Sequence, residues 1–390
     1  MSGTFYEFFA GAGMARAGLG DRWRCLFAND IDLKKAGTYD DNWGAGAMKP
    51  ADVKTLKPTD LPGEADLVWA SFPCQDLSLA GGGAGLRGER SGVFWPFWRL
   101  IAQLRDEGRG PPIVALENVA ATLTSHSGKD FEALCLALVD AGYKVGARVI
   151  DAVLFVPQSR PRMFLIAVRD DVTIPAGLVE PSGSLAGVDS RVAATYDRMV
   201  SRVVDEPELQ RVVDAWINWS VPLPSTKRAG LAEIMEDEPE GVEWHSQDET
   251  KTLIDRMSDI NRRKVIKASK AGARMFGTAY RRTRVHKGVK TVRTEVRFDG
   301  IAGCLRTPSG GSSRQIVIEV KGRRVRSRLM SSREAARLMG MSDDYKLPAA
   351  YNEAYHLIGD GVAVPVVDHL ARNIFDPLMA AIRCNLRLVA

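Results

Sequence analysis

A Pro-Cys pair stands where a short apolar segment of the chain ends. Residues 66–71 form an apolar run bounded by turn residues, which favours a buried strand, and Pro73 stiffens the backbone before the Cys74 thiol. Glycines are frequent in the following stretch, 81–92. A thiol at the end of a buried strand, followed by a glycine-rich loop, is the arrangement expected of a nucleophile beneath a mobile lid. A buried core cysteine is the alternative, because cysteine is among the residue types most often buried.

Other groups that could take part in nucleophilic chemistry lie beside further apolar segments. Glu117 comes directly after one such segment, and Arg160 and Arg162 come directly before another. Because the carboxyl ends of parallel strands share one crevice, we expect Glu117 to lie on the same rim as Cys74, with the arginines nearby. A thiol, a carboxylic acid and two arginines can add a nucleophile and stabilise the charge that develops.

The N-terminal stretch has the pattern of a nucleotide-binding unit. An apolar segment, 4–9, leads through Gly11 and Gly13 into a helical segment. Glycines at such a turn let the backbone approach a ligand, and the helix start presents free N–H groups to it. Asp30 follows the next apolar segment, at the position where such folds bind a ribose. Capping of the next helix by Asp30 or Asp32 is the alternative.

Strand-like and amphipathic helical segments alternate through the first 170 residues. This alternation predicts an α/β fold, built as a doubly wound and mostly parallel sheet. A linker rich in Pro, Gly and Ser follows at 171–190. Residues 191–260 favour acidic helices, and 261–328 contain strand-like alternation. We therefore expect a second, smaller domain after the first.

Charge is distributed unevenly along the chain. The net charge is only +5, yet 261–328 contains 20 Lys and Arg against three acidic residues. This asymmetry indicates a polyanionic partner, with a solvated basic face as the alternative. No apolar run is long enough to span a membrane, and no signal segment is present at the N-terminus. The five cysteines lack zinc-ligand spacing, so we expect no metal site and a reduced compartment.

Eight short motifs occur in the order typical of one enzyme family. Over about 1–170 and 327–375 the sequence resembles the DNA cytosine-5 methyltransferases. The resemblance implies a Rossmann-like catalytic and cofactor-binding domain at 1–174, a DNA target-recognition domain at 175–326 and a C-terminal return to the catalytic domain at 327–390. The motifs are Phe9-Ala10-Gly11-Ala12-Gly13, Asn29-Asp30-Ile31-Asp32, Asp52-Val53, Phe72-Pro73-Cys74-Gln75 with Ser78, Glu117-Asn118-Val119, Gln158-Ser159-Arg160-Pro161-Arg162, Arg333-Glu334-Ala335-Ala336-Arg337-Leu338 and Gly359-Asp360-Gly361-Val362-Ala363-Val364-Pro365.

The resemblance also implies a reaction. Cys74 would add as a thiolate to C6 of a flipped-out cytosine, and C5 would then take the methyl group of S-adenosylmethionine. Glu117 would hold N3, while Arg160 and Arg162 would orient the base and stabilise the charged intermediate. The group that removes the C5 proton is left open.

Ligand contacts follow from the same resemblance. The sequence departs from the family pattern at four positions, which would weaken the affinity for the cofactor. Glu7 stands where the family often has Asp, Met14 where it has Gly, Asp30 where it has Glu and Asp360 where it has Asn. The expected cofactor-binding residues are Phe9, Gly11, Gly13, Asp30, Ile31, Asp52, Val53, Pro73 and Asp360. The expected substrate-binding residues are Phe72, Gln75, Ser78, Asn118 and Gln158, of which Asn118 is expected mainly to brace its loop.

These expectations combine into a sequence-specific methyltransferase that acts on double-stranded DNA. We expect the modification enzyme of a bacterial restriction–modification pair, with a cognate restriction endonuclease. It would act as a monomer in the cytoplasm at the nucleoid, a bacterial origin being inferred because no regulatory extension precedes Thr4. Methylation of tRNA is one alternative. The tRNA-methylating branch usually has a shorter recognition region, so the length of 175–326 favours DNA. A DNA-binding repressor without catalysis is another, disfavoured by the presence of Cys74, Glu117 and both arginines.

Overall fold

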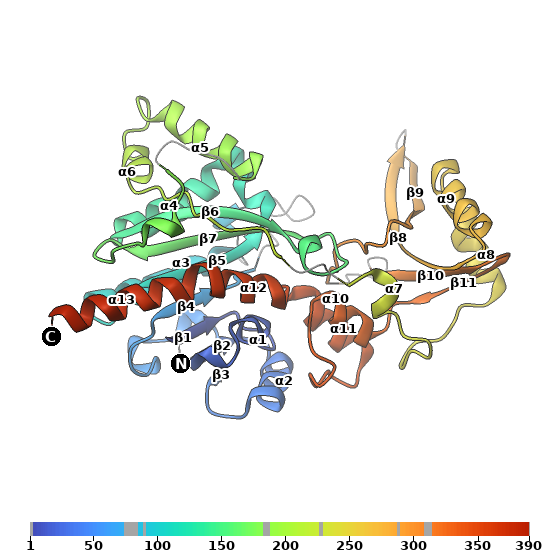
Figure 1. The fold of residues 1–390 in the computed structure, drawn as a ribbon, viewed down its shortest axis with the longest axis horizontal. Helices are drawn as coiled ribbons and strands as arrows, with labels where there is room; N and C mark the ends of the chain where they lie inside the picture. The colour runs from blue at the N-terminus through green and yellow to red at the C-terminus, as the bar shows by residue number, and fades with distance from the viewer. Residues whose placement is uncertain are drawn as a thin grey trace. The chain divides into compact units, whose positions relative to one another are not determined.

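The computed structural model divides into two compact units. Unit 1 comprises 1–150, 161–223 and 366–390, and unit 2 comprises 151–160 and 224–365. Figure 1 shows both units with their helices and strands labelled. Three of the predicted site residues, Cys74, Gln75 and Ser78, lie outside the part of the chain that the structure describes. The described residues are 3–73, 85–88, 91–181, 188–225, 229–286, 289–307 and 314–389.

A seven-stranded sheet forms the centre of unit 1, with the strand order β3-β2-β1-β4-β5-β7-β6. The pairs β1–β2, β1–β4, β2–β3 and β4–β5 are parallel, whereas β7 runs antiparallel to β5. This confirms the predicted α/β class with a mostly parallel sheet. The strands are β1 (Gly3–Phe8), β2 (Trp23–Asp30), β3 (Met48–Pro50), β4 (Leu67–Ala70), β5 (Ile113–Val119), β6 (Tyr143–Asp151) and β7 (Pro161–Arg169).

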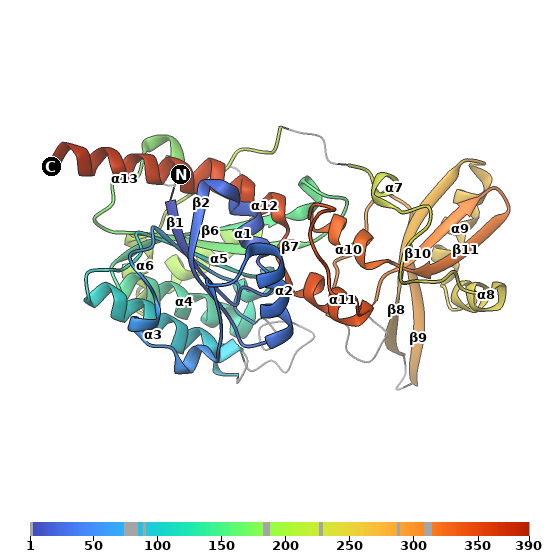
Figure 2. The ribbon, with the colours of Figure 1, turned by 90° about the horizontal axis from the view of Figure 1, so that it is seen from below.

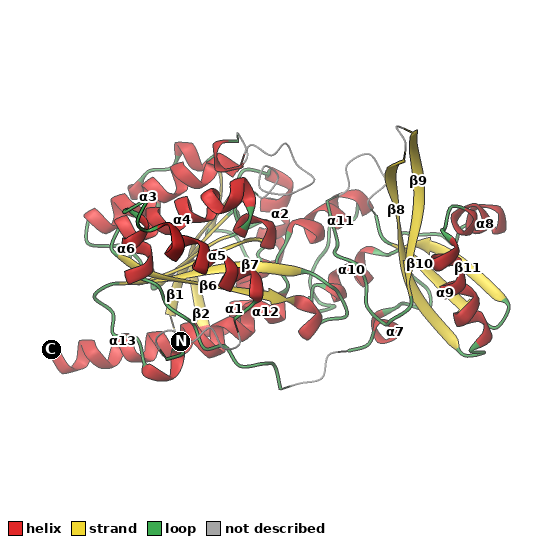
Figure 3. Cartoon of the chain, turned by 90° about the horizontal axis from the view of Figure 1, so that it is seen from above, coloured by secondary structure: helices red, strands yellow, loops and turns green. Residues whose placement is uncertain are grey.

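Helices cover both faces of this sheet (Figure 3). One face packs against α3 (Phe94–Asp106) and α4 (Lys129–Asp140), whose buried stripes join the strands in one hydrophobic cluster. On the other face, Phe375 contacts the rings of Trp23 and Trp69 edge-on. The remaining α-helices of this unit are α1 (Met14–Leu19), α2 (Leu33–Trp43), α5 (Ser190–Arg202), α6 (Leu209–Asp214) and α13 (Asp376–Val389), and α12 (Val364–Leu370) begins two residues before the chain returns to unit 1 at residue 366.

Unit 2 is built on an antiparallel sheet with the order β11-β10-β8-β9. Its core is a cluster of apolar residues between this sheet and two helices, among them Leu253, Val265 and Ile318. Figure 2 shows the four strands from below. The strands are β8 (Arg274–His286), β9 (Val289–Arg297), β10 (Ile316–Lys321) and β11 (Arg324–Leu329), and the helices are α7 (Leu231–Ile234), α8 (Gln247–Asp255), α9 (Asp259–Lys270), α10 (Ser332–Leu338) and α11 (Tyr351–Asp360).

The unit boundaries differ from the predicted ones. The predicted second domain began at 175, but Met199 is buried in the core of unit 1 and the Trp219 indole donates to the Ile166 carbonyl at 3.2 Å. The predicted return began at 327, but Arg328 and Glu334 form a fully buried ion pair inside unit 2. Long-range packing, which composition does not reveal, places both boundaries. The basic segment 261–328 does fall within unit 2.

Candidate active site

Glu117 and Arg162 meet at one edge of the unit 1 sheet. Glu117 lies near the carboxyl end of β5, and Arg162 lies near the start of β7. Because β7 runs antiparallel to β5, its start lies beside the end of β5, and Val119 pairs with Arg162. The Arg162 Nε lies 3.2 Å from the Glu117 Oε1, and these two side chains are only 15% and 8% exposed. The reversed strand therefore delivers a guanidinium to the rim that the parallel strands form.

This ion pair is suited to holding a planar polar ring. A guanidinium and a carboxylate together present N–H donors and oxygen acceptors in fixed directions. Water is largely excluded, so their electrostatic influence on a bound group is stronger than at the surface. The carboxylate can bind a ring N–H, while the guanidinium can stabilise negative charge on a neighbouring oxygen.

The segment that leads to Cys74 is held by two side chains. The amide of Asn118 donates to the Phe72 carbonyl at 3.1 Å, and its oxygen accepts the Val119 N–H at 2.8 Å. The Ser91 hydroxyl donates to the Pro73 carbonyl at 2.9 Å. Phe72 itself is buried. Asn118 therefore has the bracing geometry that was expected of it.

Ser91 is a site-supporting residue that sequence reasoning missed. It is fully buried and lies 18 positions after the carbonyl that it binds. The available signal was its place at the end of the glycine-rich run, where a hydroxyl can bond to the backbone on which the run began.

A tight turn between β1 and α1 surrounds the carboxylate of Asp30. Gly11 and Gly13 both have positive φ, and so does Phe9, at 55°. Asp30 Oδ2 accepts the Gly11 N–H at 2.8 Å, and Oδ1 accepts the Asp32 N–H at 2.9 Å. A positive φ at a non-glycine residue is costly and is common at functional sites. The carboxylate thus orients the glycine turn, and each of its oxygens retains acceptor capacity for a ligand hydroxyl.

The structure resolves the alternative that was open for Asp30. Helix α2 is capped by Asp32, whose carboxylate accepts the N–H groups of Lys34 and Lys35 at 2.9 and 3.3 Å. Asp30 is therefore not the capping residue. Beside it, Ile31 is 67% exposed, which is unusual for a large apolar side chain and leaves it available to cover a ligand.

Asp52 and Val53 take different places. Asp52 caps a short turn by accepting the Lys54 N–H at 3.0 Å. Val53 is buried within the hydrophobic cluster of unit 1, so its side chain is a core residue. The ring of Phe9 is half-buried and contacts Phe97, with 6.0 Å between the ring centroids.

Glu7 lies fully buried behind the glycine turn. It accepts the Arg16 N–H and the Tyr39 hydroxyl, each at 3.4 Å. Burial, which disfavours the charged form, raises the pKa of Glu7 to about 8, although the hydrogen bond from Arg16 opposes the shift. A protonated Glu7 at neutral pH would support the turn as a neutral hydrogen-bonding group.

Arg160 does not have the geometry of a base-orienting residue. Its guanidinium is buried and donates to the carbonyls of Leu305, Gly359 and Gly361 at 2.9, 3.0 and 2.6 Å, and to the Cys304 sulfur at 3.4 Å. This disagrees with the expected catalytic role, because the N–H groups that would reach a base are donated to the protein. Arg160 precedes β7, the strand on which Arg162 lies, and its carbonyl partners follow it by 145 residues or more.

Gln158 and Asp360 also have partners within unit 2. The Gln158 amide donates to the Leu338 carbonyl at 2.8 Å and accepts the Leu305 N–H at 2.9 Å, and the side chain is fully buried. Such an amide holds its own backbone surroundings together and has no surface to offer a substrate. Asp360 accepts a hydrogen bond from the Thr307 hydroxyl.

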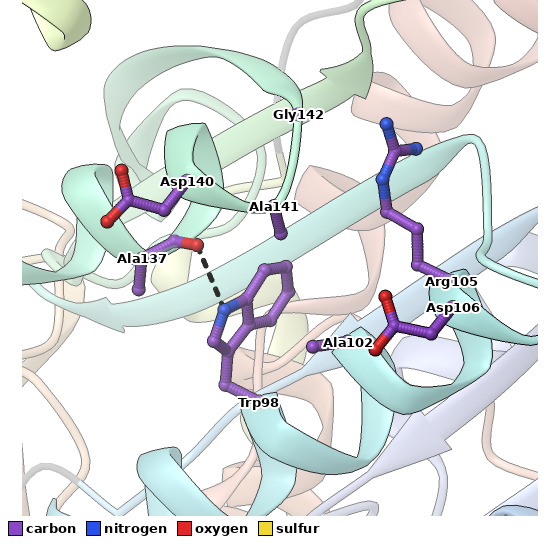
Figure 4. A pocket seen from close by; sticks show the side chains of 8 residues that line it. All are labelled: Trp98, Ala102, Arg105, Asp106, Ala137, Asp140, Ala141 and Gly142. Carbon is purple, nitrogen blue, oxygen red and sulfur yellow. Dashed lines mark hydrogen bonds between the residues drawn. The ribbon is translucent and has the colours of Figure 1, made fainter.

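A separate pocket lies between α3 and α4, away from these residues. Its volume is about 490 Å³, and Figure 4 shows the Trp98 indole donating to the Ala137 carbonyl at its wall. The lining includes none of the predicted site residues, and it offers small apolar side chains beside a few charged groups. The lining residues are Trp98, Ala102, Arg105, Asp106, Ala137, Asp140, Ala141 and Gly142.

Solved structures with a similar fold are methyltransferases. A DNMT2 mutant of Spodoptera frugiperda matches with a TM-score of 0.59 at 16% identity, covering 95% of this chain and 99% of that one. The Dnmt2 methyltransferase of S. pombe matches with a TM-score of 0.55 at 15% identity, covering 96% and 98%. At these identities the similarity establishes the fold.

Sequence comparison is more specific. M.BsuFI of Bacillus subtilis is 25% identical over 386 residues, covering 97% of this chain and 74% of that protein. M.NlaX of Neisseria lactamica is 26% identical over 378 residues, covering 96% of each, and M.HhaI of Haemophilus parahaemolyticus is 24% identical over 381 residues, covering 96% and 94%. All three are type II methyltransferases.

A family model spans nearly the whole chain. The model described as "C-5 cytosine-specific DNA methylase" matches residues 3–376, which include every motif named above. The mostly parallel sheet agrees with the fold of the solved methyltransferase structures. The chain belongs to the C-5 cytosine-specific DNA methylase family.

Proposed function

We propose that this enzyme methylates C5 of one cytosine within a specific sequence of double-stranded DNA, as the modification enzyme of a bacterial restriction–modification system. The observation that carries the proposal is the Glu117–Arg162 pair, 3.2 Å apart at the rim to which the Asn118-braced segment leads. The pair supplies a carboxylate and a guanidinium that can both hydrogen-bond to the polar edge of a pyrimidine ring. The type II relatives support the biological role.

The turn between β1 and α1 is the proposed site for S-adenosylmethionine. Asp30 would accept the ribose hydroxyls, the Gly11–Gly13 backbone would pass the methionine part, and Ile31 and Phe9 would cover the adenine. When bound, this cofactor supplies an electrophilic methyl group. The remaining chemistry belongs to side chains of the chain.

Cys74 is the proposed nucleophile. Its thiolate would add to C6 of cytosine and make C5 nucleophilic. C5 would then bond to the methyl carbon as the methyl–sulfur bond of the sulfonium breaks, with the neutral thioether as the leaving group. Glu117 binds the ring at N3, where a proton offsets the developing charge, and Arg162 stabilises that charge from beside the carboxylate. Loss of the C5 proton and departure of the thiolate restore the ring. The structure describes Glu117 and Arg162, and the role of Cys74 rests on the motif.

The target base must leave the helix before this chemistry can occur, because C5 and C6 are hidden in the stack. Extrusion costs a few kcal/mol, which contacts to the surrounding DNA can offset. Unit 2 carries the basic segment 261–328 and is the proposed source of those contacts.

The decisive experiment compares Cys74→Ala with Cys135→Ala. Both remove a thiol, but Cys135 is buried in the core of unit 1, so its variant serves as the matched control. Purified proteins are given labelled S-adenosylmethionine with duplex DNA or with tRNA, and DNA products are mapped by bisulfite sequencing. We expect transfer to DNA cytosine C5 by the wild type and by Cys135→Ala, and none by Cys74→Ala. Transfer by Cys74→Ala would refute the mechanism, and a preference for tRNA would refute the substrate.

A further inference from the structure

Strands β8 and β9 continue as a two-stranded ribbon beyond the sheet of unit 2. β10 pairs with β8 only from Arg274 to Ala279. β8 and β9 remain paired to each other far beyond that point, out to His286 and Val289. All three ribbon views show the two strands leaving the sheet side by side (Figures 1–3). A two-stranded ribbon without a third strand is marginally stable in water by itself. The extension therefore adds little to the stability of the sheet, and a role in binding is expected for it.

The ribbon is strongly basic. No acidic residue occurs from 281 to 294, whereas this stretch contains six Lys and Arg. Arg282 and Arg293 are cross-strand partners, which places two like charges on the same face. Like charges directly opposite one another destabilise an antiparallel pair. Glu295 offsets the charge of Arg282, so a polyanion is expected to supply the negative charge beside Arg293.

One arginine of this pair is held in place and the other is free to bind. Arg282 lies 3.1 Å from the Glu295 carboxylate and donates to the Tyr280 hydroxyl at 3.1 Å. Arg293 is exposed, and no carboxylate among the described residues pairs with it. The Arg293 guanidinium therefore keeps its full set of donors for an external acceptor.

The base of the ribbon is anchored firmly enough to position these groups. A Cβ on Gly303 would come within 2.5 Å of the Tyr280 ring, so only glycine allows that close approach. On the opposite face, Thr294 is fully buried, and its N–H donates to the Arg256 carbonyl at 3.1 Å. The Thr294 face is thus covered at this level, whereas Arg293, one position before it on the other face, is exposed.

We propose that this ribbon enters the major groove of the target DNA and that Arg293, beside the anchored Arg282, reads a guanine of the recognition sequence. The major groove admits a two-stranded β-ribbon, and arginine binds guanine O6 and N7 through two parallel hydrogen bonds. The inference rests on the proposed function for its substrate, double-stranded DNA. It adds the element that reads the sequence and the residue that discriminates.

Lys290 supplies the internal comparison. It lies three positions before Arg293 on β9, and because side chains alternate along a strand, its side chain lies on the face opposite to that of Arg293. It is exposed and carries the same charge. A residue that contacts only phosphates contributes affinity without sequence preference, whereas a base-reading arginine contributes discrimination.

The test uses DNA binding and needs no turnover. The recognition sequence is first identified by bisulfite sequencing of DNA that the wild type has methylated. Fluorescence anisotropy then gives Kd for cognate duplexes and for duplexes with one base pair changed, over a range of salt. Arg293→Lys, which keeps the charge but loses the fork, is expected to lower discrimination at one position by roughly 5- to 150-fold. Lys290→Gln is expected to weaken binding equally for all duplexes and to reduce the salt slope by about one.

A shortened ribbon provides the second arm. Replacing Arg282–Arg293 by Asn-Gly joins the paired residues Arg281 and Thr294 through a two-residue turn and keeps the buried Thr294 anchor. This variant should unfold at the wild-type urea concentration, yet lose sequence-specific binding. Wild-type discrimination by Arg293→Lys or by the folded short-ribbon variant would overturn the inference. A wild type that methylates no DNA cytosine would instead overturn the proposed function.

Discussion

Replacement of Arg160 by Met separates a structural from a catalytic role for this arginine. The guanidinium joins three backbone carbonyls from two segments of unit 2, those of Leu305, Gly359 and Gly361. Arg160→Met keeps most of the side-chain volume and removes every donor. Without the Arg160 N–H groups, the three carbonyls must either bind water or stay buried without hydrogen-bond partners.

The size of the effect follows from these bonds. A hydrogen bond from a charged donor contributes about 1.5–3 kcal/mol, so three bonds set an upper bound of roughly 5–9 kcal/mol. Two effects offset part of this loss of stability. The folded protein no longer has to desolvate a buried cation, and water can hydrate some of the freed carbonyls. We expect a net loss of about 3–5 kcal/mol in the free energy of unfolding, at the upper end for a single substitution.

Hydrogen exchange locates the loss. Arg160→Met should accelerate exchange of the amides at 302–307 and 359–361, and it should lower the urea midpoint. Arg162→Met is the matched control on the same segment: it should leave exchange at those amides unchanged and lower kcat, because Arg162 pairs with Glu117. Wild-type exchange in Arg160→Met, together with a kcat loss of 100-fold or more, would refute the structural role and restore a role at the base.

Three further predictions concern unit 1 and the core of unit 2. Asn118→Ala should lower the single-turnover rate constant of methyl transfer roughly 10-fold or more, because the Phe72 carbonyl loses its donor, while the Kd for DNA stays constant. An unchanged rate constant would contradict the brace. Burial raises the pKa of Glu7 to about 8 in the folded protein. The contribution of Glu7 to the free energy of unfolding is therefore fully present below pH ~4.5 and is lost as the pH rises to about 8. Over that range the free energy of unfolding should fall by up to about 1.4 kcal/mol per pH unit. Urea midpoints measured across this range should show the slope in the wild type and not in Glu7→Gln. Arg328→Met leaves the buried Glu334 carboxylate without its counter-ion and should cost about 3–5 kcal/mol in urea unfolding. The Arg328→Met/Glu334→Gln double variant removes the charge, keeps an acceptor for the Glu236 and Ser331 N–H groups and should recover part of that loss.

Local patterns were sufficient to predict the fold class and the rim residues of the parallel strands. Alternating apolar and amphipathic segments predicted the sheet, and Glu117 could be placed because the end of a parallel strand always faces the shared edge. Ser331 likewise caps α10, as a serine before a helical segment often does: its hydroxyl accepts the Glu334 N–H at 3.0 Å. Such interactions span only a few residues, so the sequence contains all of their determinants.

The two arginines show where local reasoning stops. Arg160 and Arg162 are two positions apart and would share a face on a regular strand. β7 begins between them, and its antiparallel direction brings Arg162 to Glu117 while Arg160 is buried among carbonyls that follow it by 145 residues or more. Neither the strand start nor its direction can be read from a six-residue motif.

The sequence by itself therefore determined the chemistry: which side chains are available, in what order, and which family they belong to. Tertiary structure decided which of these side chains reach the reaction edge and which support it. It paired Arg162 with Glu117, assigned helix capping to Asp32 and left Asp30 to orient the glycine turn. The physical reason is that hydrogen-bond partners distant in the chain compete for each donor, and only the folded packing determines which partner binds it.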